Sequence, residues 1–393
     1  MQKPVYLDHH ATTPIDPRVL EAMLPYFGPR FGNAASRTHA YGWQAEKAVE
    51  RARQQVADLA GAAAREIVFT SGATESINLA LKGLLEASRA PGGHMVTMAT
   101  EHKAALDTAA RLVSQGCGLT VLPPRPDGLI DLDQLRAAIL PGTVLVSVMA
   151  ANNEIGVLQP VRQIGALCRE MGVMFHCDAA QAFGKVPLDV EADGLDLMSI
   201  SAHKMYGPKG IGALYVRRRG RHVALAAQID GGGHEHGLRS GTLNVPGIVG
   251  LGEACAICAR EMAGEAGRVA GLRDRFKALL EANVEGVHVN GSMERRLPGN
   301  LNVSFPRVDG EALLMSLPDL ALSTGSACSS ATVEPSHVLK AIGIGDSLAR
   351  SSVRFGLGRF NTAEEVEYAA MRVVEAARRL REQAPVKPSG AML

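Results

Sequence analysis

The chain has 393 residues, and its 41 lysines and arginines balance 40 aspartates and glutamates to a net charge of +1. This length can bury a sizeable core and favours two domains. The balanced charge, an N-terminus without a signal-peptide core and the lack of any run of about 18 uncharged apolar residues argue against membrane or direct nucleic-acid binding, so we expect a soluble cytoplasmic protein.

The first clear helical pattern runs from Gln44 to Ala60, where apolar residues recur on one face. Asp131 suits a helix N-cap, with Gln134 as a weak capping-box partner. Seven short runs are typical of strands, namely Ile67–Phe69, His94–Met98, Leu119–Leu122, Val144–Met149, Val173–Cys177, Leu197–Ile200 and Ile211–Val216. Strands that alternate with helices imply parallel pairing, with ligands at the carboxyl ends of the strands. We therefore predict one large α/β domain.

The C-terminal third has a different order of elements. A long helix is expected over residues 246–284, followed by a strand at Leu301–Phe305 and a helix from Ala363 to Arg381. This order favours a smaller α+β domain. The predicted division is a large domain at 15–258, a small domain made of 1–14 and 259–382, and a tail at 383–393, which holds two prolines and no periodicity.

The six cysteines are too scattered for a disulfide framework, which fits a reducing compartment. Cys255 and Cys258 form a lone C-x-x-C pair in a helical pattern, and core packing is favoured over half of a zinc site, so no resident metal is expected. The basic run Arg217–Arg219 with Arg221 is interpreted as a solvated loop in preference to a docking patch.

The segment Ser201–Lys204 carries the strongest chemical signal. It follows an apolar strand directly, and a lysine at the end of a buried strand is costly unless it has a use. A partly desolvated amine has a lowered pKa and forms a Schiff base with an aldehyde. Ser201 and His203 flank Lys204 with donors that suit a phosphate. By itself the segment fits an ordinary surface turn equally well.

Two further segments strengthen this interpretation. Asp178 ends a predicted strand, where its carboxylate can pair with a protonated pyridine nitrogen, and Gln181 can donate to a ring oxygen. Residues 70–76, which include Ala73 and Thr74, follow another strand and open a helix, so their backbone N–H groups can form a phosphate cup. An acid, a lysine and a phosphate cup at strand ends of one sheet indicate a site for pyridoxal phosphate (PLP).

These segments, together with Thr100–Lys103, resemble the PLP signature of the cysteine desulfurases in the class V aminotransferase group. The resemblance implies a fold type I PLP-dependent transferase, with a mainly parallel seven-stranded sheet in the large domain. It also implies roles for individual residues. Lys204 matches the lysine that carries the cofactor, and His102 matches the histidine that stacks on its ring. The other implied cofactor ligands are Ala73, Thr74, Asn153, Asp178, Gln181, Ser201 and His203, with Thr242 reaching the phosphate of a partner subunit in a homodimer.

The reaction depends on one cysteine. Residues 323–332 are almost all small and surround Cys328, which predicts an exposed, mobile loop, whereas the other five cysteines lie in apolar or helical settings and are expected to be buried. The loop resembles that of the IscS/NifS type, although Thr324 stands where serine is common. The resemblance implies that Cys328 takes sulfur from L-cysteine as a persulfide, leaving L-alanine, with Lys204 and His102 moving protons.

Substrate and acceptor assignments follow from the same resemblance. Arg354 matches the arginine that grips the substrate carboxylate, and Asn33 and Asn153 match further substrate ligands, although relatives often have proline where Ala34 stands. The expected sulfur acceptors are an iron–sulfur scaffold protein and other carriers, which include those of tRNA thiolation. Cys328 would ligate an iron–sulfur cluster only transiently, in a scaffold complex.

Two alternatives stay open at this point. One is another class V enzyme, such as a selenocysteine lyase or a small-substrate aminotransferase, and the other is a non-catalytic scaffold protein that keeps the fold.

Overall fold

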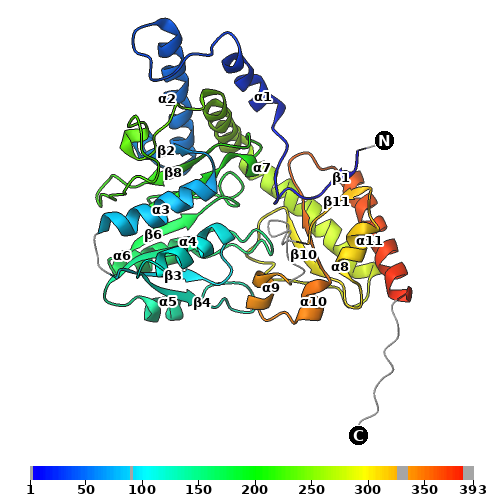
Figure 1. Ribbon diagram of the computed structural model, residues 1–393. Coiled ribbons are helices and arrows are strands. Elements are labelled where there is room, and N and C mark those ends of the chain that lie inside the picture. The colour runs from blue at the N-terminus through cyan, green and yellow to red at the C-terminus, as the bar shows by residue number, and fades with distance from the viewer. Residues whose placement is uncertain (1–2, 89–91, 325–334, 384–393) are drawn as a thin grey trace.

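The computed structural model describes residues 3–88, 92–324 and 335–383. Its main sheet has seven strands in the order β2-β8-β7-β6-β5-β3-β4 (Figure 1). The strands are β2 (Ile67–Thr70), β3 (His94–Met98), β4 (Gly118–Leu122), β5 (Thr143–Met149), β6 (Met174–Asp178), β7 (Leu197–Ser201) and β8 (Gly212–Val216). Each end lies within one residue of its predicted position. The predicted α/β fold with a mainly parallel seven-stranded sheet is confirmed.

One strand departs from the parallel pairing that the alternation implied. β8 is antiparallel to both β7 and β2. Only ten residues separate the end of β7 from the start of β8, and a parallel neighbour would need a crossover of a dozen or more. At the turn into β8, a Cβ on Gly212 would lie 2.4 Å from the carbonyl oxygen of Ile200, so glycine permits this close approach.

Successive side chains of a strand point to opposite faces of the sheet, and apolar side chains lie on both faces here. Helices therefore cover both faces. In β7, Met198 and Ile200 join one core and Leu197 joins another. The first core is shared with α2 (Ala40–Ala60), α5 (Leu132–Ala138) and α6 (Val161–Glu170), and the second with α3 (Ala73–Ser88) and α4 (Lys103–Val113). The predicted cap of α5 is confirmed, since Asp131 accepts from the backbone N–H of Asp133 and Gln134.

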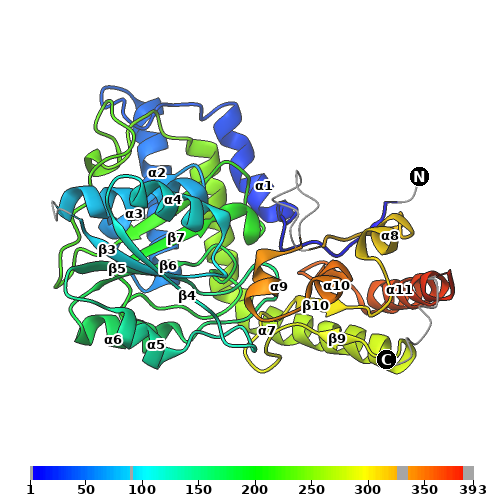
Figure 2. The same cartoon turned by 60° about the horizontal axis from the view of Figure 1, so that its bottom comes forward.

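The long helix α7 (Val245–Asn283) passes from the main sheet to a second core (Figures 1 and 2). This core contains Phe276 of α7, Phe305, Phe355 and Leu7. Its elements are β1 (Val5–Tyr6), β9 (His288–Val289), β10 (Asn300–Ser304), α8 (Gly310–Met315), β11 (Leu320–Ala321), β12 (Ser352–Gly356) and α11 (Ala363–Gln383). Two cores fit a two-domain chain, while the predicted boundaries stay a prediction. Residues 384–393 of the predicted tail lie outside the described residues.

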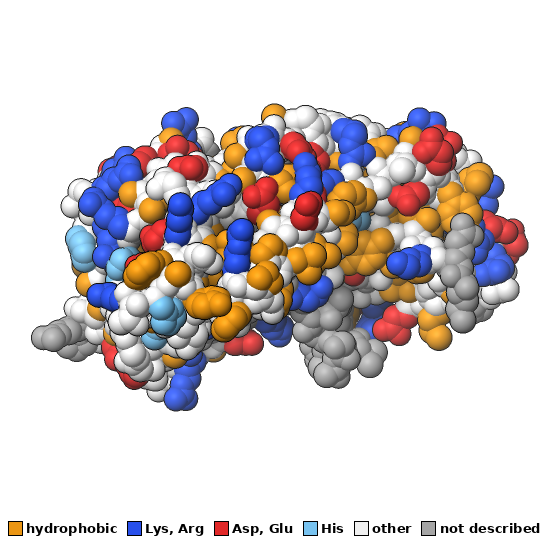
Figure 3. All heavy atoms as spheres, turned by 90° about the horizontal axis from the view of Figure 1, so that it is seen from above, with side chains coloured by type: hydrophobic (Ala, Val, Ile, Leu, Met, Phe, Trp, Pro, Cys, Tyr) orange, Lys and Arg blue, Asp and Glu red, His pale blue; other side chains and the backbone are white. Residues whose placement is uncertain are grey.

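The remaining elements are short. They are α1 (Pro17–Met23), α9 (His337–Ala341), α10 (Asp346–Arg350) and the 3-10 turns η1 (Leu24–Phe27), η2 (Ala64–Glu66), η3 (Ala202–Lys204) and η4 (Glu235–Gly237). Large apolar side chains stay exposed around α1 and the start of α2, namely Leu24, Phe27, Phe31, Tyr41 and Trp43. Figure 3 shows apolar side chains on the face that lies at the top of Figure 1. Within the described ranges, no helix has the length and apolar composition to span a membrane.

The interpretation of the basic run as a solvated loop is wrong for Arg217. Arg217 is buried and donates to the carbonyl oxygens of Leu195 and Val190, while Arg221 donates to those of Gly172 and Val173. These two arginines therefore have a structural role, because each guanidinium joins its own segment to a backbone segment distant in sequence. Cys255 and Cys258 both lie in the core beside the main sheet, which agrees with core packing of the C-x-x-C pair.

Candidate active site

A cavity of about 460 Å³ lies where β6 and β7 end, a volume typical of small-molecule sites. Its wall brings together residues that are far apart in sequence. Ten of the predicted site residues line it, namely Ala73, Thr74, His102, Asn153, Asp178, Gln181, Ser201, His203, Lys204 and Arg354.

The N-terminus of α3 forms one end of the cavity. Gly72, Ala73 and Thr74 line the wall there, and the first N–H groups of a helix have no partner within it. Gly72 has φ +152°, and a Cβ at this position would meet nothing within 4 Å, so the open cradle suits an anion. Ser201 and His203 line the same cavity, in agreement with a phosphate-binding end.

Asp178 is buried at the end of β6. Its Oδ1 accepts from the backbone N–H of Ala180 at 2.9 Å, and within the described residues no salt bridge neutralises it. Burial raises its pKa, while that N–H and the nearby His102 and Lys204 act in the opposite direction. A buried carboxylate of this kind favours a cationic ligand, such as a protonated pyridine nitrogen.

His102 has a second function that the sequence did not reveal. It is the N-cap of α4, and its Nδ1 accepts from the backbone N–H of Ala104 at 3.1 Å. A neutral imidazole that accepts at Nδ1 carries its proton on Nε2. The cap therefore fixes both the ring and its tautomer at the cavity wall.

Lys204 ends the η3 turn directly after β7 and reaches the N-terminal segment. Its Nζ donates to the backbone carbonyl oxygens of His10 at 2.6 Å and Ala11 at 2.8 Å. His10 and Ala11 also line the cavity, and sequence reasoning missed both. They follow β1 without any periodic pattern, so only the fold reveals that they lie beside Lys204.

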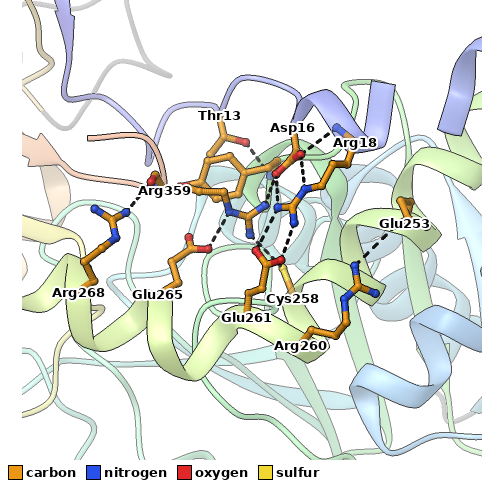
Figure 4. Close-up of polar contacts among 11 residues, drawn as sticks. Thr13, Asp16, Arg18, Glu253, Cys258, Arg260, Glu261, Glu265, Arg268 and Arg359 are labelled. Carbon is orange, nitrogen blue, oxygen red and sulfur yellow. Dashed lines mark hydrogen bonds and ion pairs between the residues drawn. The ribbon is translucent and has the colours of Figure 1, made fainter. Parts of the chain in front are cut away.

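The turn that bears Lys204 is clamped from outside the sheet. Thr13 Oγ1 donates to the carbonyl oxygen of His203 and accepts from the backbone N–H of Tyr206, which has φ +66°. The guanidinium of Arg359 stacks on the Tyr206 ring at 4.2 Å. Figure 4 shows Asp16 of the N-terminal segment and Glu265 of α7 converging on Arg359, and each forms an ion pair with it at 2.7 Å. Three distant parts of the chain thus position the catalytic lysine candidate.

Arg354 lies on β12 at the opposite side of the cavity. Its guanidinium donates to the carbonyl oxygen of Asn153 at 2.9 Å, the carboxylate of Asp8 at 2.8 Å and the Ser323 hydroxyl at 3.2 Å. Its side chain is only 3% exposed, so the fork is held rigidly at the cavity wall. A fixed guanidinium of this kind suits a substrate carboxylate.

Two predicted site residues that the structure describes, Asn33 and Thr242, do not line this cavity. Asn33 is exposed, and its Oδ1 accepts from the backbone N–H of Ala35. Thr242 is also exposed. Cys328 lies outside the described residues, so its place stays a prediction.

The other cysteines are poor nucleophiles. Burial raises the pKa of Cys168 to about 12 and of Cys258 to about 11, and those of Cys177 and Cys255 also lie well above their usual range. Cys117 is only half-buried, which corrects the expectation that all five are buried, because it directly precedes the half-buried start of β4. Its pKa is raised too, by burial. A thiol in such surroundings forms little thiolate at neutral pH.

The donor set fits PLP. An anion cradle, a buried carboxylate, an imidazole and a lysine amine share one cavity of suitable volume. No group of three or more His, Cys, Asp and Glu side chains that could hold a metal ion occurs among the residues described.

Comparison with known proteins agrees with this geometry. The aminotransferase class-V family model matches residues 5–369. The chain is similar to a cysteine desulfurase IscS of Anaeromyxobacter dehalogenans, with 59% identity over 98% of this chain and 95% of the relative. It is also similar to a solved NifS-like protein, with a TM-score of 0.89 and 37% identity over 96% of this chain and all of that one. A solved structure described as SspA in complex with cysteine matches with a TM-score of 0.81 and 38% identity over 91% of this chain and all of that one.

With a family model that spans most of its length and relatives at this identity, the chain belongs to the class-V aminotransferase family and, within it, to the IscS-type cysteine desulfurases.

Proposed function

We propose that this chain is a cysteine desulfurase that uses PLP to convert L-cysteine into L-alanine and a persulfide on Cys328. The observation that carries the proposal is the shared cavity, in which Lys204, Asp178 and His102 face Arg354 across one space. Membership of the IscS-type desulfurases supports the same reaction. Bound PLP supplies an electron sink for the negative charge that develops at the substrate Cα.

Each side chain has a distinct task. Lys204 would hold the cofactor and, once the substrate amine has replaced it, take the proton from the substrate Cα. Asp178 would hold the ring nitrogen in its protonated form. Arg354 would orient the substrate by its carboxylate, and His102 would stack on the ring with its Nε2–H available as a hydrogen-bond donor.

The sulfur transfer itself depends on Cys328. Its thiolate attacks the substrate sulfur, and a new S–S bond forms as the substrate Cβ–S bond breaks. The electron pair of the broken bond takes up a proton at Cβ, and the proton that Lys204 removed returns to Cα, which completes alanine. The raised pKa values of the five described cysteines support this assignment, because none of them is activated as a nucleophile.

We also propose a homodimer with shared active sites. Thr242 and Asn33 are exposed and lie off the cavity wall of their own chain, as expected for groups that complete a site with a second copy. The exposed Phe27, Phe31 and Trp43 give an apolar surface that a second copy can cover. Cross-linking with and without Trp43→Ala tests this arrangement.

The persulfide would pass to an iron–sulfur scaffold protein in the cytoplasm, and to carriers for tRNA thiolation. This proposal rests on the resemblance to the IscS type, whose desulfurase activity the relatives share by name. A pull-down of candidate scaffolds with the full chain and with a chain that ends at residue 383 tests whether the tail contributes, and equal recovery would show that it does not.

Replacement of the nucleophile tests the proposal. Cys328→Ser should abolish sulfide and alanine formation from cysteine while the cofactor spectrum stays intact. Cys117→Ser is the matched control and should keep wild-type turnover, since its thiol is not activated. Normal sulfur release by Cys328→Ser would favour another class V activity. A purified chain that shows no PLP absorbance, or keeps it in Lys204→Ala, would favour a non-catalytic scaffold.

A further inference from the structure

Behind Gln181 lies a second lysine, Lys185, that the reaction described above does not use. Its Nζ donates to Gln181 Oε1 at 3.2 Å. Lys185 lines a separate cavity of about 30 Å³ together with His9, His10 and Glu265, whereas Gln181 lines the larger cavity of the candidate active site. Gln181 and His10 are 4% and 2% exposed, while Lys185 is half-buried, so the amide end of this contact is shielded from water.

The partners of Gln181 fix the orientation of its amide. Gln181 Nε2 donates to the carbonyl oxygen of His10 at 2.8 Å, which can only accept. Since Nε2 must face that carbonyl, Oε1 faces Lys185 and accepts from its Nζ. An amide NH₂ carries two donors, and the contact with His10 uses one of them. The other is left for a group in the larger cavity.

The same amide fixes His10. Oε1 lies 3.2 Å from His10 Nδ1, and because this oxygen accepts, Nδ1 must carry the proton. The buried Nε2 of His10, which has no hydrogen-bond partner among the residues that the structure describes, is then the unprotonated nitrogen. The His10 carbonyl oxygen also accepts from Lys204 Nζ, so a chain of contacts runs from Lys185 through Gln181 and His10 to Lys204.

Keeping an amine in this place is costly, which argues for a use. Burial, with a further contribution from the charge of Lys204, lowers the pKa of Lys185 to about 7. Arg354 acts in the same direction, and Glu265 and Cys258 oppose it. An apolar side chain of similar length would avoid the cost of desolvation.

We propose that Lys185 is a positioning residue that holds the Gln181 amide with its NH₂ group toward the cofactor cavity, so that Gln181 donates to the acidic oxygen on the ring of bound PLP. The proposal rests on PLP binding as described above and deepens it. Lys185 would act through Gln181 and not by touching the cofactor.

The spectrum of the bound cofactor provides the test. A donor to the ring oxygen favours its ionised form. Lys185→Met leaves the Gln181 amide held by His10 alone, so it should move the midpoint of the spectral pH titration of the holoenzyme upward by about one pH unit. Lys185→Arg keeps an obligatory donor and should stay near the wild-type midpoint. Lys277→Met, at a half-buried position of α7 that lines neither cavity, is the matched control and should not change it.

The background of Gln181→Ala separates positioning from a direct effect of charge. If Lys185 acts through the amide, Gln181→Ala should give the shift alone, and adding Lys185→Met should give no further shift. An unchanged midpoint in Lys185→Met, a Lys185→Arg midpoint equal to that of Lys185→Met, or shifts that add in the double variant would overturn the proposal. The titration needs no cysteine turnover, so a failure of the desulfurase assignment would appear separately, as a normal spectrum without alanine formation.

Discussion

The two sides of the cavity are built in different ways. On the sheet side, Asp178, Ser201 and Lys204 stand at or just after the ends of adjacent strands, so local sequence places them. On the opposite side, Arg354 is held by Asp8, which is 346 residues away in sequence, and by the carbonyl oxygen of Asn153. Because different parts of the chain hold the two sides, we expect that substitutions can disturb the cofactor contacts and the substrate contacts independently.

The largest effect should come from the sheet side. Lys204→Ala removes both the covalent anchor and the base, so turnover should fall by more than about 10³-fold and the bound-cofactor absorbance should disappear. Absorbance and alanine formation measured on the same preparation check this. Retention of either at the wild-type level would show that the lysine is not the anchor.

Arg354→Lys should disturb the opposite side alone. Loss of the two-pronged contact with the carboxylate should raise the KM for cysteine about 10- to 100-fold and leave the cofactor spectrum unchanged. Steady-state kinetics at several cysteine concentrations provide the measurement. A lost spectrum with an unchanged KM would mean that the two sides are not separable.

The ion pairs of Arg359, which position the turn that bears Lys204, should contribute to the free energy of unfolding. Arg359 and Asp16 have side chains that are 9% and 2% exposed, so Arg359→Gln should lower the free energy of unfolding by about 3–5 kcal/mol. The matched control is Arg136→Gln, which breaks the exposed pair with Glu170 and should leave the unfolding midpoint unchanged. Equal effects of the two variants would show that the ion pair between Arg359 and Asp16 adds no more stability than an exposed pair does.

The smallest expected effect concerns acid sensitivity of the sheet. His176 lies buried between Ser147 and Ser199, and burial lowers its pKa to about 3. The unfolded chain therefore binds one more proton than the folded chain between about pH 6.5 and 3, so this histidine makes stability fall with decreasing pH in that window, by at most about 1.4 kcal/mol per pH unit. His176→Gln should flatten the fall, as urea unfolding at pH 6 and pH 4 can show. Parallel curves for the two proteins would contradict this.

Much of the sheet side could be predicted from the sequence. The strand bounds were predicted within one residue, and strand-end positions led to Asp178, Ser201 and Lys204, because a buried strand reveals its end by a change from apolar to polar residues. The antiparallel direction of β8 was missed, because the alternation of strands and helices implied parallel pairing and the short connection before β8 was not considered. Residues such as Asp8 and His10 could not be found, since no local pattern marks a segment that contacts partners hundreds of residues away.

The central claim is that sulfur from cysteine moves to Cys328. The most direct measurement is a single turnover with sulfur-labelled cysteine, followed by mass spectrometry of the peptide that contains Cys328. The account predicts one labelled sulfur atom added to that peptide for each alanine formed, and none on peptides that contain Cys117, Cys168, Cys177, Cys255 or Cys258. Alanine formed without label on Cys328, or with the label on another cysteine, would contradict it.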